Sequence, residues 1–420
     1  MVPCFKHLYY RLLNIFQGNG MIVTQTRQIS SCHDFELDVA RTTKLHYDIA
    51  YPSEGKADAV VFIIAGFGED TNSEYLQKLR RYAAETFNVV AVSVYYHCFY
   101  SRPNNGASLE FDDIDIAVLQ DVIARYEVDF SAVQHITKEH VLEHLNAVFS
   151  ARKKAQTMEE SAQVMVPMTL VPHNGEYQNF GLMQAVDHMN VLLDIQRHFD
   201  VVCEKTTTIF LGSSHGGYIA SLCAKIAPQL VDVVIDNSSY VTPNLQYIVG
   251  KERNINAPEY LVYHKHLRLH CFVQTLWTTN TQSPYCFSQD RYRIRDLSDT
   301  GHLHRHVEAA QGSIRYIAYH STEDMLASPR EKEQFYRNLQ DLGFSATLHL
   351  VDNSMIDGRF IKTLEHGMQM SIKELMNREL PQVLNDAPRV IQRGREFCCQ
   401  CDTLTYRFVV QDHALQSTCV

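Results

Sequence analysis

The clearest chemical signal in the sequence is a glycine-rich segment at residues 212–217, which reads Gly-Ser-Ser-His-Gly-Gly. A β-branched and aromatic run at residues 206–211 precedes it, and apolar residues at helical spacing follow it as far as Pro228. This context predicts a nucleophile elbow, a tight turn between a strand and a helix that exposes the hydroxyl of its serine. We therefore expect Ser214 to attack a carbonyl carbon.

A serine nucleophile of this kind needs an acid and a base, which follow it along the chain in that order. Asp324 follows a strand-like run at residues 314–320 and precedes a helix start marked by Ser328 as N-cap. His366 follows the next strand-like run and precedes a further helix. We therefore expect His366 to be the base and Asp324 to be the acid that orients it.

Other residues compete for these two roles. Glu323 is next to Asp324, and Asp236 follows another buried strand-like run, where some hydrolases carry their acid. His320 precedes the acid and His349 lies inside a strand pattern, so both are expected to make structural hydrogen bonds. Asp236 remains the alternative acid.

An acyl-transfer site also needs hydrogen-bond donors for the oxyanion that forms during the reaction. One donor is expected to be the backbone N–H of His215, the residue after the nucleophile. The other is expected after the most apolar run of the chain, residues 59–64, where Ala-Gly-Phe-Gly follows. Phe67 is the first candidate and Gly68 the second.

A polar aromatic cluster follows the strand-like run at residues 89–94. Ligands of open α/β sheets bind at the carboxyl ends of the strands. Tyr95, Tyr96 and His97 are therefore candidates for substrate contact. The alternative is that they pack beneath a lid.

The order of the elements predicts an α/β-hydrolase fold, with a mostly parallel sheet, helices on both faces and an inserted helical lid. The hydrolase domain is expected at residues 21–387. Two insertions, at about residues 106–178 and 244–312, are expected to form the lid, and helical patterns occur near residues 114–126 and 140–149 of the first.

The two ends of the chain are expected to lie outside this domain. Residues 1–20 form a basic, amphipathic segment without a small-residue cleavage site, which argues against a secretory signal. An N-terminal appendage is preferred, and a membrane-surface helix is the alternative. Residues 388–420 turn strand-like and are expected to be a tail or an edge hairpin.

Composition excludes several classes of protein. The 420 residues carry a net charge of -10 without a dense Lys/Arg stripe, which argues against a nucleic-acid partner. The longest apolar runs are too short for an integral membrane segment. Eleven scattered cysteines favour the reducing cytoplasm. Their one cluster, Cys398, Cys399 and Cys401, lacks the spacing of a zinc site, so we expect no metal.

Six short motifs occur together in the chain. They are Tyr96-His97-Cys98, Tyr177-Gln178-Asn179-Phe180-Gly181, residues 212–218, Asp236-Asn237-Ser238, Ser283-Pro284-Tyr285 and Leu364-Glu365-His366-Gly367. In this combination, over residues 22–385, the chain resembles an uncharacterised epsilonproteobacterial family, domain of unknown function 2920, which itself resembles α/β hydrolases. The resemblance supports Ser214 and His366 by position and leaves the acid open. Such proteins are often encoded among flagellar-glycosylation genes, which implies an acylated sugar or glycoconjugate as substrate.

These patterns together predict a serine hydrolase that works through an acyl-enzyme and needs no cofactor. The preferred interpretation is an esterase or deacylase that acts on a small acylated metabolite or sugar. A peptidase and an acyltransferase of the same fold are alternatives, because both use the same residues. A catalytically silent glycan-binding or interaction module is the alternative from a different class.

Overall fold

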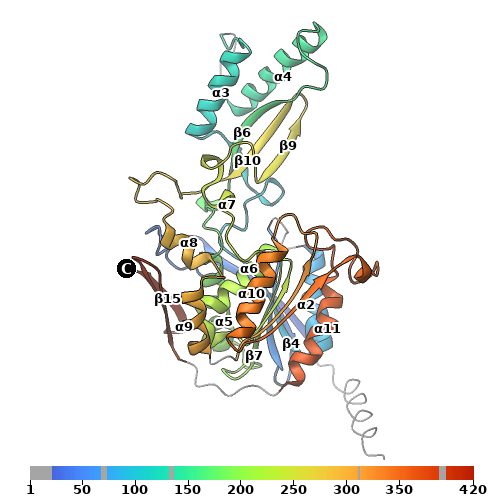
Figure 1. Cartoon of the computed structure of the whole chain (residues 1–420), viewed down its shortest axis with the longest axis vertical. Coiled ribbons are helices and arrows are strands. Elements are labelled where there is room, and N and C mark those ends of the chain that lie inside the picture. The colour runs from blue at the N-terminus through green and yellow to red at the C-terminus, as the bar shows by residue number, and fades with distance from the viewer. Residues whose placement is uncertain (1–20, 68–72, 132–136, 311–312, 387–393) are drawn as a thin grey trace, which may run out of the picture. The chain divides into compact units, whose positions relative to one another are not determined.

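The computed structural model describes residues 21–67, 73–131, 137–310, 313–386 and 394–420. The expected appendage at residues 1–20 and the oxyanion candidate Gly68 lie outside these ranges. The chain forms two compact units (Figure 1). The first combines the chain up to Tyr96 with Gly181–Pro243 and Asp290–Val420, and the second combines His97–Phe180 with Asn244–Gln289. Among the described residues, no helix is both long and apolar enough to cross a membrane.

An eight-stranded sheet forms the centre of the first unit. Its strands are β1 (Ile22–Ser30), β2 (Lys44–Pro52), β3 (Ala59–Ile64), β4 (Val89–Tyr95), β7 (Thr207–Ser213), β8 (Val233–Asn237), β11 (Arg315–Ser321) and β12 (Ser345–Val351). They lie in the order β1-β2-β4-β3-β7-β8-β11-β12. All neighbours from β4 to β12 are parallel, whereas β2 runs antiparallel to both β1 and β4. The predicted α/β-hydrolase fold is confirmed.

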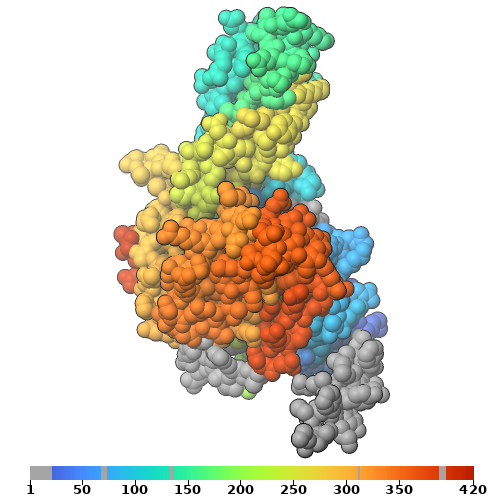
Figure 2. Space-filling view, turned by 45° about the vertical axis from the view of Figure 1, so that its right-hand side comes forward, coloured from blue at the N-terminus to red at the C-terminus, as the bar shows by residue number. Residues whose placement is uncertain are grey.

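Helices cover both faces of this sheet (Figure 1). On one face, α2 (Glu74–Phe87) and α11 (Ile372–Asn385) pack with Val61 and Ile63 of β3 in one buried apolar cluster. On the other face lie α5 (Leu182–His198), α6 (His215–Ile226) and α10 (Pro329–Asp341), and Phe62 of β3 contacts His188 of α5. Successive strand residues point to opposite faces, so one strand supplies both layers. Figure 2 shows α2, in light blue, beside the orange-red surface of the C-terminal segments.

Serine residues are the N-caps of three of these helices. Ser73 accepts a hydrogen bond from Leu76 N at the start of α2, Ser328 accepts from Glu331 N at the start of α10, and Ser371 accepts from Glu374 N at the start of α11. Each hydroxyl satisfies a backbone N–H that has no partner within its helix. The N-cap predicted at Ser328 is confirmed.

The second unit contains a four-stranded sheet as well as helices. Strands β5 (Ser108–Glu110), β6 (Val164–Val171), β10 (Leu267–Val273) and β9 (Tyr260–His264) are neighbours in that order. Its helices are α3 (Asp113–Arg125), α4 (Lys138–Lys154) and the short α7 (Gln246–Val249). The sequence predicted the two long helices but not the sheet, because the pairing of β6 with β10 joins segments about a hundred residues apart.

The second predicted insertion is longer than the segment found in this unit. Residues 290–312 were expected to belong to the lid. The structure instead assigns Asp290 onward to the first unit, where α8 (Gln289–Arg295) and α9 (Thr300–Ala310) lead into β11. Helix α9 carries the buried side chains His302, Leu303 and His306, which gives it a face that packs in that unit.

The C-terminal residues form a separate antiparallel sheet of β13 (Glu396–Gln400), β14 (Thr405–Gln411) and β15 (Ala414–Cys419). The sequence analysis expected a tail or an edge hairpin, whereas these residues form a three-stranded sheet that does not pair with the central sheet. Its inner side chains Phe397, Tyr406 and Phe408 are buried, and β15 packs against α5. The apolar face of a small sheet must be covered to be stable, and the rest of the first unit covers it here.

A buried ion pair ties this C-terminal sheet to the rest of the first unit. Arg295 donates hydrogen bonds to both carboxylate oxygens of Glu36, at 3.0 and 2.5 Å, and neither side chain is exposed. The hydroxyl of Tyr406 donates to the same carboxylate at 2.9 Å. Segments from both ends of the described chain therefore meet at one buried carboxylate.

We expect Glu36→Gln to lower the free energy of unfolding by about 3–5 kcal/mol, because it leaves the Arg295 guanidinium buried opposite a neutral amide. The matched control is Glu396→Gln, which breaks an exposed pair with Arg407 and should leave the free energy of unfolding nearly unchanged. Urea unfolding of both variants measures the difference. Equal losses would contradict the assignment of Glu36 as an anchor.

Several histidines of the first unit are buried, and burial lowers their pKa. The pKa of His188 and of His320 falls to about 4, and that of His215 and of His306 falls to about 3. The pKa of His302, which is next to His306 in α9, also lies well below its usual value. These imidazoles are neutral in the folded protein near neutral pH.

Because an unfolded histidine takes up a proton near pH 6.5, the unfolded state binds more protons than the folded state below that pH. The free energy of unfolding should therefore fall as the pH drops from about 6.5 to 4, by about 1.4 kcal/mol per pH unit for each buried histidine. Urea titrations across this range measure the slope. His306→Gln should reduce it, whereas His304→Gln, at an exposed position of α9, should not. A free energy of unfolding that stays constant over this pH range would contradict the conclusion that these histidines are buried in their neutral form.

Candidate active site

Ser214 lies at the turn between β7 and α6 with a strained backbone, at φ 54° and ψ -119°. Non-glycine residues adopt such conformations at a cost of about 1–3 kcal/mol, and they do so most often at functional sites. Glycines around the turn permit it. A Cβ atom on Gly212 would lie 2.2 Å from the backbone of Gly216, and a Cβ atom on Gly216 would lie 2.2 Å from the carbonyl oxygen of Ile64. The local geometry is that of a nucleophile elbow.

The structure brings Ser214, His366 and Asp324 together. Ser214 Oγ lies 2.7 Å from His366 Nε2, and His366 Nδ1 lies 2.8 and 3.1 Å from the two carboxylate oxygens of Asp324. These distances are those of hydrogen bonds. Three residues that lie between 42 and 152 positions apart in the chain thus form one continuous hydrogen-bonded series.

Asp324 lies in the loop after β11 with its side chain fully buried. Its Oδ1 accepts hydrogen bonds from the backbone N–H groups of Leu326 and Ala327, both at 2.9 Å. Burial by itself would raise the pKa of the Asp324 carboxyl, but the hydrogen bonds from His366 and Ala327 outweigh it and hold the pKa below its usual range. The residue next to His366 is therefore a carboxylate held in a fixed position.

The competing acids have different surroundings. Asp236 accepts hydrogen bonds from Lys332 Nζ at 2.6 Å and from the hydroxyl of Ser239 at 2.7 Å, in a site with 1% exposure of both charged side chains. His366 Nδ1 hydrogen-bonds to Asp324 and not to this carboxylate. Glu323 is exposed to solvent. Of the three candidate acids, Asp324 is the one next to the base.

The other histidines considered for the base lie in structural positions. His320 is buried, and its Nε2 lies 3.0 Å from the carbonyl oxygen of Ala327. The ring of His349 stacks on Tyr319, with centroids 4.3 Å apart. Only His366, at 19% side-chain exposure, is both hydrogen-bonded to Ser214 and open to solvent among these three.

His215 is the first residue of α6, so its backbone N–H lies at the positive end of the helix, where an anion is favoured. The ring of Phe67, in the loop after β3, contacts the His215 ring at 5.5 Å between centroids. The two predicted oxyanion donors that the structure describes therefore lie on neighbouring segments.

The His215 side chain has a structural role that the sequence analysis missed. It is fully buried, with Nε2 2.6 Å from Gln184 Oε1 and Nδ1 hydrogen-bonded to the hydroxyl of Tyr240. These contacts hold the first turn of α6 against α5. The sequence did contain a sign of this role, since a histidine on the apolar face of a predicted helix needs hydrogen-bond partners inside the protein.

The candidate substrate residues do not form one cluster. Tyr95 donates a hydrogen bond to Asp48 at 3.1 Å, on the neighbouring strand β2. Tyr96 is buried behind the elbow, with its ring near those of His188 and His215. His97 belongs to the second unit, where its ring contacts Tyr177. The observed contacts of Tyr95 and Tyr96 favour packing, the alternative that the sequence left open.

A cavity of about 220 Å³ lies beside His366, at the carboxyl ends of β3, β7 and β8. His366 and Gly367 form one wall, and Ser213, next to the candidate nucleophile, lies on another. The start of α2 contributes Tyr75 and Leu76. This cavity therefore contacts the elbow, the strand before the oxyanion loop and the loop of the base.

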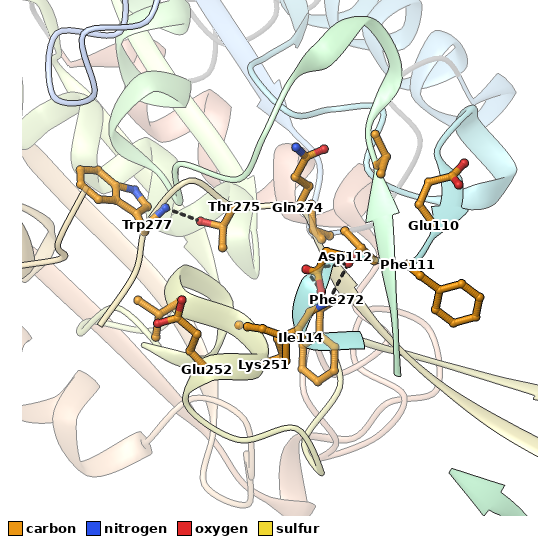
Figure 3. Close-up of a pocket in the computed structure, with 15 residues that line it drawn as sticks. Glu110, Phe111, Asp112, Ile114, Lys251, Glu252, Phe272, Gln274, Thr275 and Trp277 are labelled. Carbon is orange, nitrogen blue, oxygen red and sulfur yellow. Dashed lines mark hydrogen bonds and ion pairs between the residues drawn. The ribbon is translucent and has the colours of Figure 1, made fainter. Parts of the chain in front are cut away.

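A second cavity, of about 300 Å³, lies in the second unit and contains an ion-pair network (Figure 3). Lys251 Nζ donates hydrogen bonds to Asp112 at 2.8 Å, to Asp115 at 2.7 Å and to Thr169 at 2.6 Å. Each of its three N–H donors thus has an acceptor. Two carboxylates of this network therefore share the one ammonium group of Lys251.

The cysteine cluster is divided between surface and interior. Cys398 is exposed on β13, whereas Cys399 is buried with its Sγ 3.4 Å from Nδ1 of His302. Within the described ranges, no group of three or more His, Cys, Asp or Glu side chains is placed to hold a metal ion.

The chain is similar to solved structures of peptidases and esterases at low sequence identity. Acylaminoacyl peptidase from Pyrococcus horikoshii shares 12% identity at a TM-score of 0.45, over 88% of this chain and 43% of the peptidase. Esterase Est22 shares 11% identity at a TM-score of 0.42, over 90% of this chain and 86% of the esterase. Esterase 2 from Thermogutta terrifontis, phosphoramylated by tabun, shares 9% identity at a TM-score of 0.42, over 87% of this chain and 97% of the esterase. The chain spans less than half the length of the peptidase.

No curated protein sequence matches the chain significantly. One family model matches residues 25–417, which is nearly the whole chain. This match includes the C-terminal strands β13 to β15, which the sequence analysis had placed outside the family resemblance. Because the match covers both units and the C-terminal sheet, the chain belongs to the family described as protein of unknown function, DUF2920.

Proposed function

We propose that the protein is a serine hydrolase that works through an acyl-enzyme, as an esterase or deacylase of small acylated metabolites or sugars. The observation that carries the proposal is the hydrogen-bonded series from Ser214 Oγ through His366 to the buried carboxylate of Asp324. The strained backbone of Ser214 supports it, because strain of this kind is stable only where the surrounding packing imposes it.

In the proposed reaction, Ser214 Oγ attacks the carbonyl carbon of the ester while its proton passes to His366 Nε2. The tetrahedral intermediate collapses, its bond to the leaving alcohol breaks, and His366 returns the proton to that alcohol. The acyl group is now esterified to Ser214. His366 then takes a proton from water as the water oxygen attacks the acyl carbon. The bond between this carbon and Ser214 Oγ breaks, His366 returns the proton to Oγ, and the acid leaves.

Asp324 determines which nitrogen of His366 carries the proton. A carboxylate accepts hydrogen bonds only, so Nδ1 is the protonated nitrogen and the lone pair of Nε2 faces Ser214. When His366 becomes an imidazolium during attack, the same carboxylate stabilises its charge. Because the backbone N–H groups of Leu326 and Ala327 hold the carboxylate, it does not have to reorganise during the reaction.

The developing oxyanion would be stabilised by the start of α6. The backbone N–H of His215 lies at the positive end of that helix, in the residue that follows the nucleophile. Phe67 is the proposed second donor. The hydrogen bonds of the His215 side chain to Gln184 and Tyr240 keep the first helical turn in position, which preorganises this donor.

We expect a fluorophosphonate probe to label Ser214 covalently in the folded protein, because a hydrogen-bonded imidazole activates the hydroxyl. Ser214→Ala should abolish labelling and lower hydrolysis of p-nitrophenyl esters by about 10³-fold or more. The matched control is Ser221→Ala, in the same helix, where the hydroxyl bonds to the carbonyl of Gly217. Mass spectrometry of the labelled peptide locates the adduct. Absence of labelling in the native wild-type protein would refute the proposal.

We expect Asp324→Asn to lower kcat by about 10² to 10⁴-fold with little change in the melting temperature, because the base loses its orienting charge. Asp236→Asn should have the opposite profile. It leaves Lys332 buried without its carboxylate and should lower the free energy of unfolding by about 3–5 kcal/mol. Its effect on kcat should be within a few-fold. Steady-state kinetics and thermal unfolding of both variants separate the two acids, and a reversed pattern would assign the role to Asp236.

A further inference from the structure

The cavity beside His366 is apolar on most of its surface. Aliphatic side chains from four segments line it: Ile64 at the end of β3, Leu76 in α2, Leu211 in β7, and Met370 with Ile372 before and at the start of α11. Among the described lining residues, His366 is the one ionisable side chain other than the phenol of Tyr75. A charged ligand group would lose its hydration here without gaining a counter-charge.

Of the polar side chains that line this cavity, the buried Asn237 already has partners within the protein, whereas Gln369 is exposed to solvent. The side-chain amide of Asn237 donates hydrogen bonds to Ser213 Oγ at 3.1 Å and to the carbonyl oxygen of Gly367 at 3.3 Å. The ligand group that fits best is therefore one that needs no hydrogen bonds, such as an aliphatic chain. The cavity in the second unit differs, because its wall is an ion-pair network around Lys251.

The position of the cavity connects it to the proposed acyl-enzyme. His366 lines the cavity, and its Nε2 is 2.7 Å from the hydroxyl of Ser214. Ser213, which also lines it, is bonded directly to Ser214 in the chain. An acyl group on Ser214 Oγ is therefore next to two residues of the cavity wall, Ser213 and His366.

The volume limits the length of that chain. An apolar protein cavity of about 150 Å³ holds a benzene molecule, with six carbon atoms. At the same packing, about 220 Å³ holds roughly eight or nine carbon atoms. Acetyl would leave most of the cavity empty, and a chain of twelve or more carbons would exceed it by about a third or more.

We propose that this cavity binds the acyl chain of the substrate, so that the enzyme selects esters of uncharged aliphatic acids of about four to eight carbons. The assignment rests on the proposed serine hydrolase function and names the substrate class of that site. Each additional methylene that enters the cavity raises kcat/KM about fourfold, the equivalent of removing one CH₂ group from water.

The test uses the full-length protein and a series of p-nitrophenyl esters from acetate to dodecanoate. The ratio of kcat/KM for octanoate to that for acetate should exceed about 100, and the values should fall for decanoate and dodecanoate. Met370→Trp should shorten the preferred chain and reduce the octanoate to acetate ratio at least about tenfold. Met370→Ala should move the optimum toward decanoate. Ile372→Trp is a second variant that places a larger side chain in the cavity, at a less buried position than Met370.

Met355→Trp is the control, because Met355 is exposed and does not line the cavity. Its octanoate to acetate ratio should equal that of the wild type. Acetate hydrolysis by each variant verifies that the protein is folded and active. If Met370→Trp and Ile372→Trp both hydrolyse the acetate ester and keep the wild-type ratio of kcat/KM for octanoate to acetate, the cavity does not bind the acyl chain. The proposed serine hydrolase function would not be affected by that result. If the wild type hydrolyses no ester and Ser214 takes up no fluorophosphonate, the proposed function and this inference fail together.

Discussion

The candidate site depends on how closely the first turn of α6 approaches the ends of β3 and β7. At Gly212 and Gly216 the backbones are so near each other that a single Cβ atom would overlap its neighbours. This approach brings the Ser214 hydroxyl and the start of the helix to the same side of the sheet. The positive end of the helix then lies where negative charge would develop. The strain at Ser214 is maintained because the packing around it leaves no room for a relaxed turn.

The acid and the base are held by a different mechanism. Asp324 is fixed by backbone N–H groups of its own loop, and this loop ends where Ser328 caps α10. His366 sits in a loop whose following residues, Gly367 and Met368, have positive φ angles. Local hydrogen bonds thus orient the acid, whereas the position of the base follows from the packing of its loop between β12 and α11. The two meet because β11 and β12 are parallel neighbours that end at the same edge.

Buried charges are matched by partners from distant parts of the chain. Glu36 pairs with Arg295, and Asp236 pairs with Lys332 behind the elbow. A buried charge without its partner is strongly unfavourable, so each pair restricts the arrangements that the chain can adopt. These pairs link α8 and the C-terminal sheet to the N-terminal segment, and α10 to β8. The C-terminal residues belong to the fold for this reason, and the family match includes them.

Local patterns in the sequence were sufficient for the elbow, the helix N-cap at Ser328, the main strands and the order of nucleophile, acid and base. Strand and helix periodicity and capping residues act over only a few positions, so they can be read from the chain directly. Ser214, Asp324 and His366 were selected in this way, and the structure places them within hydrogen-bonding distance of one another. Their catalytic roles stay a prediction.

The tertiary structure decided what depends on contacts between distant residues. Asp236 and Asp324 both follow strands of one sheet, and the sequence could not separate them. Asp236 faces Lys332 of α10, while Asp324 turns toward His366. The sheet of the second unit was missed because β6 and β10 come from separate insertions. The C-terminal sheet was expected to be a tail or an edge hairpin, because its buried partner, Glu36, lies 370 positions away from Tyr406. Short-range patterns specify elements, whereas the pairing of side chains across such separations is determined only when the chain is packed.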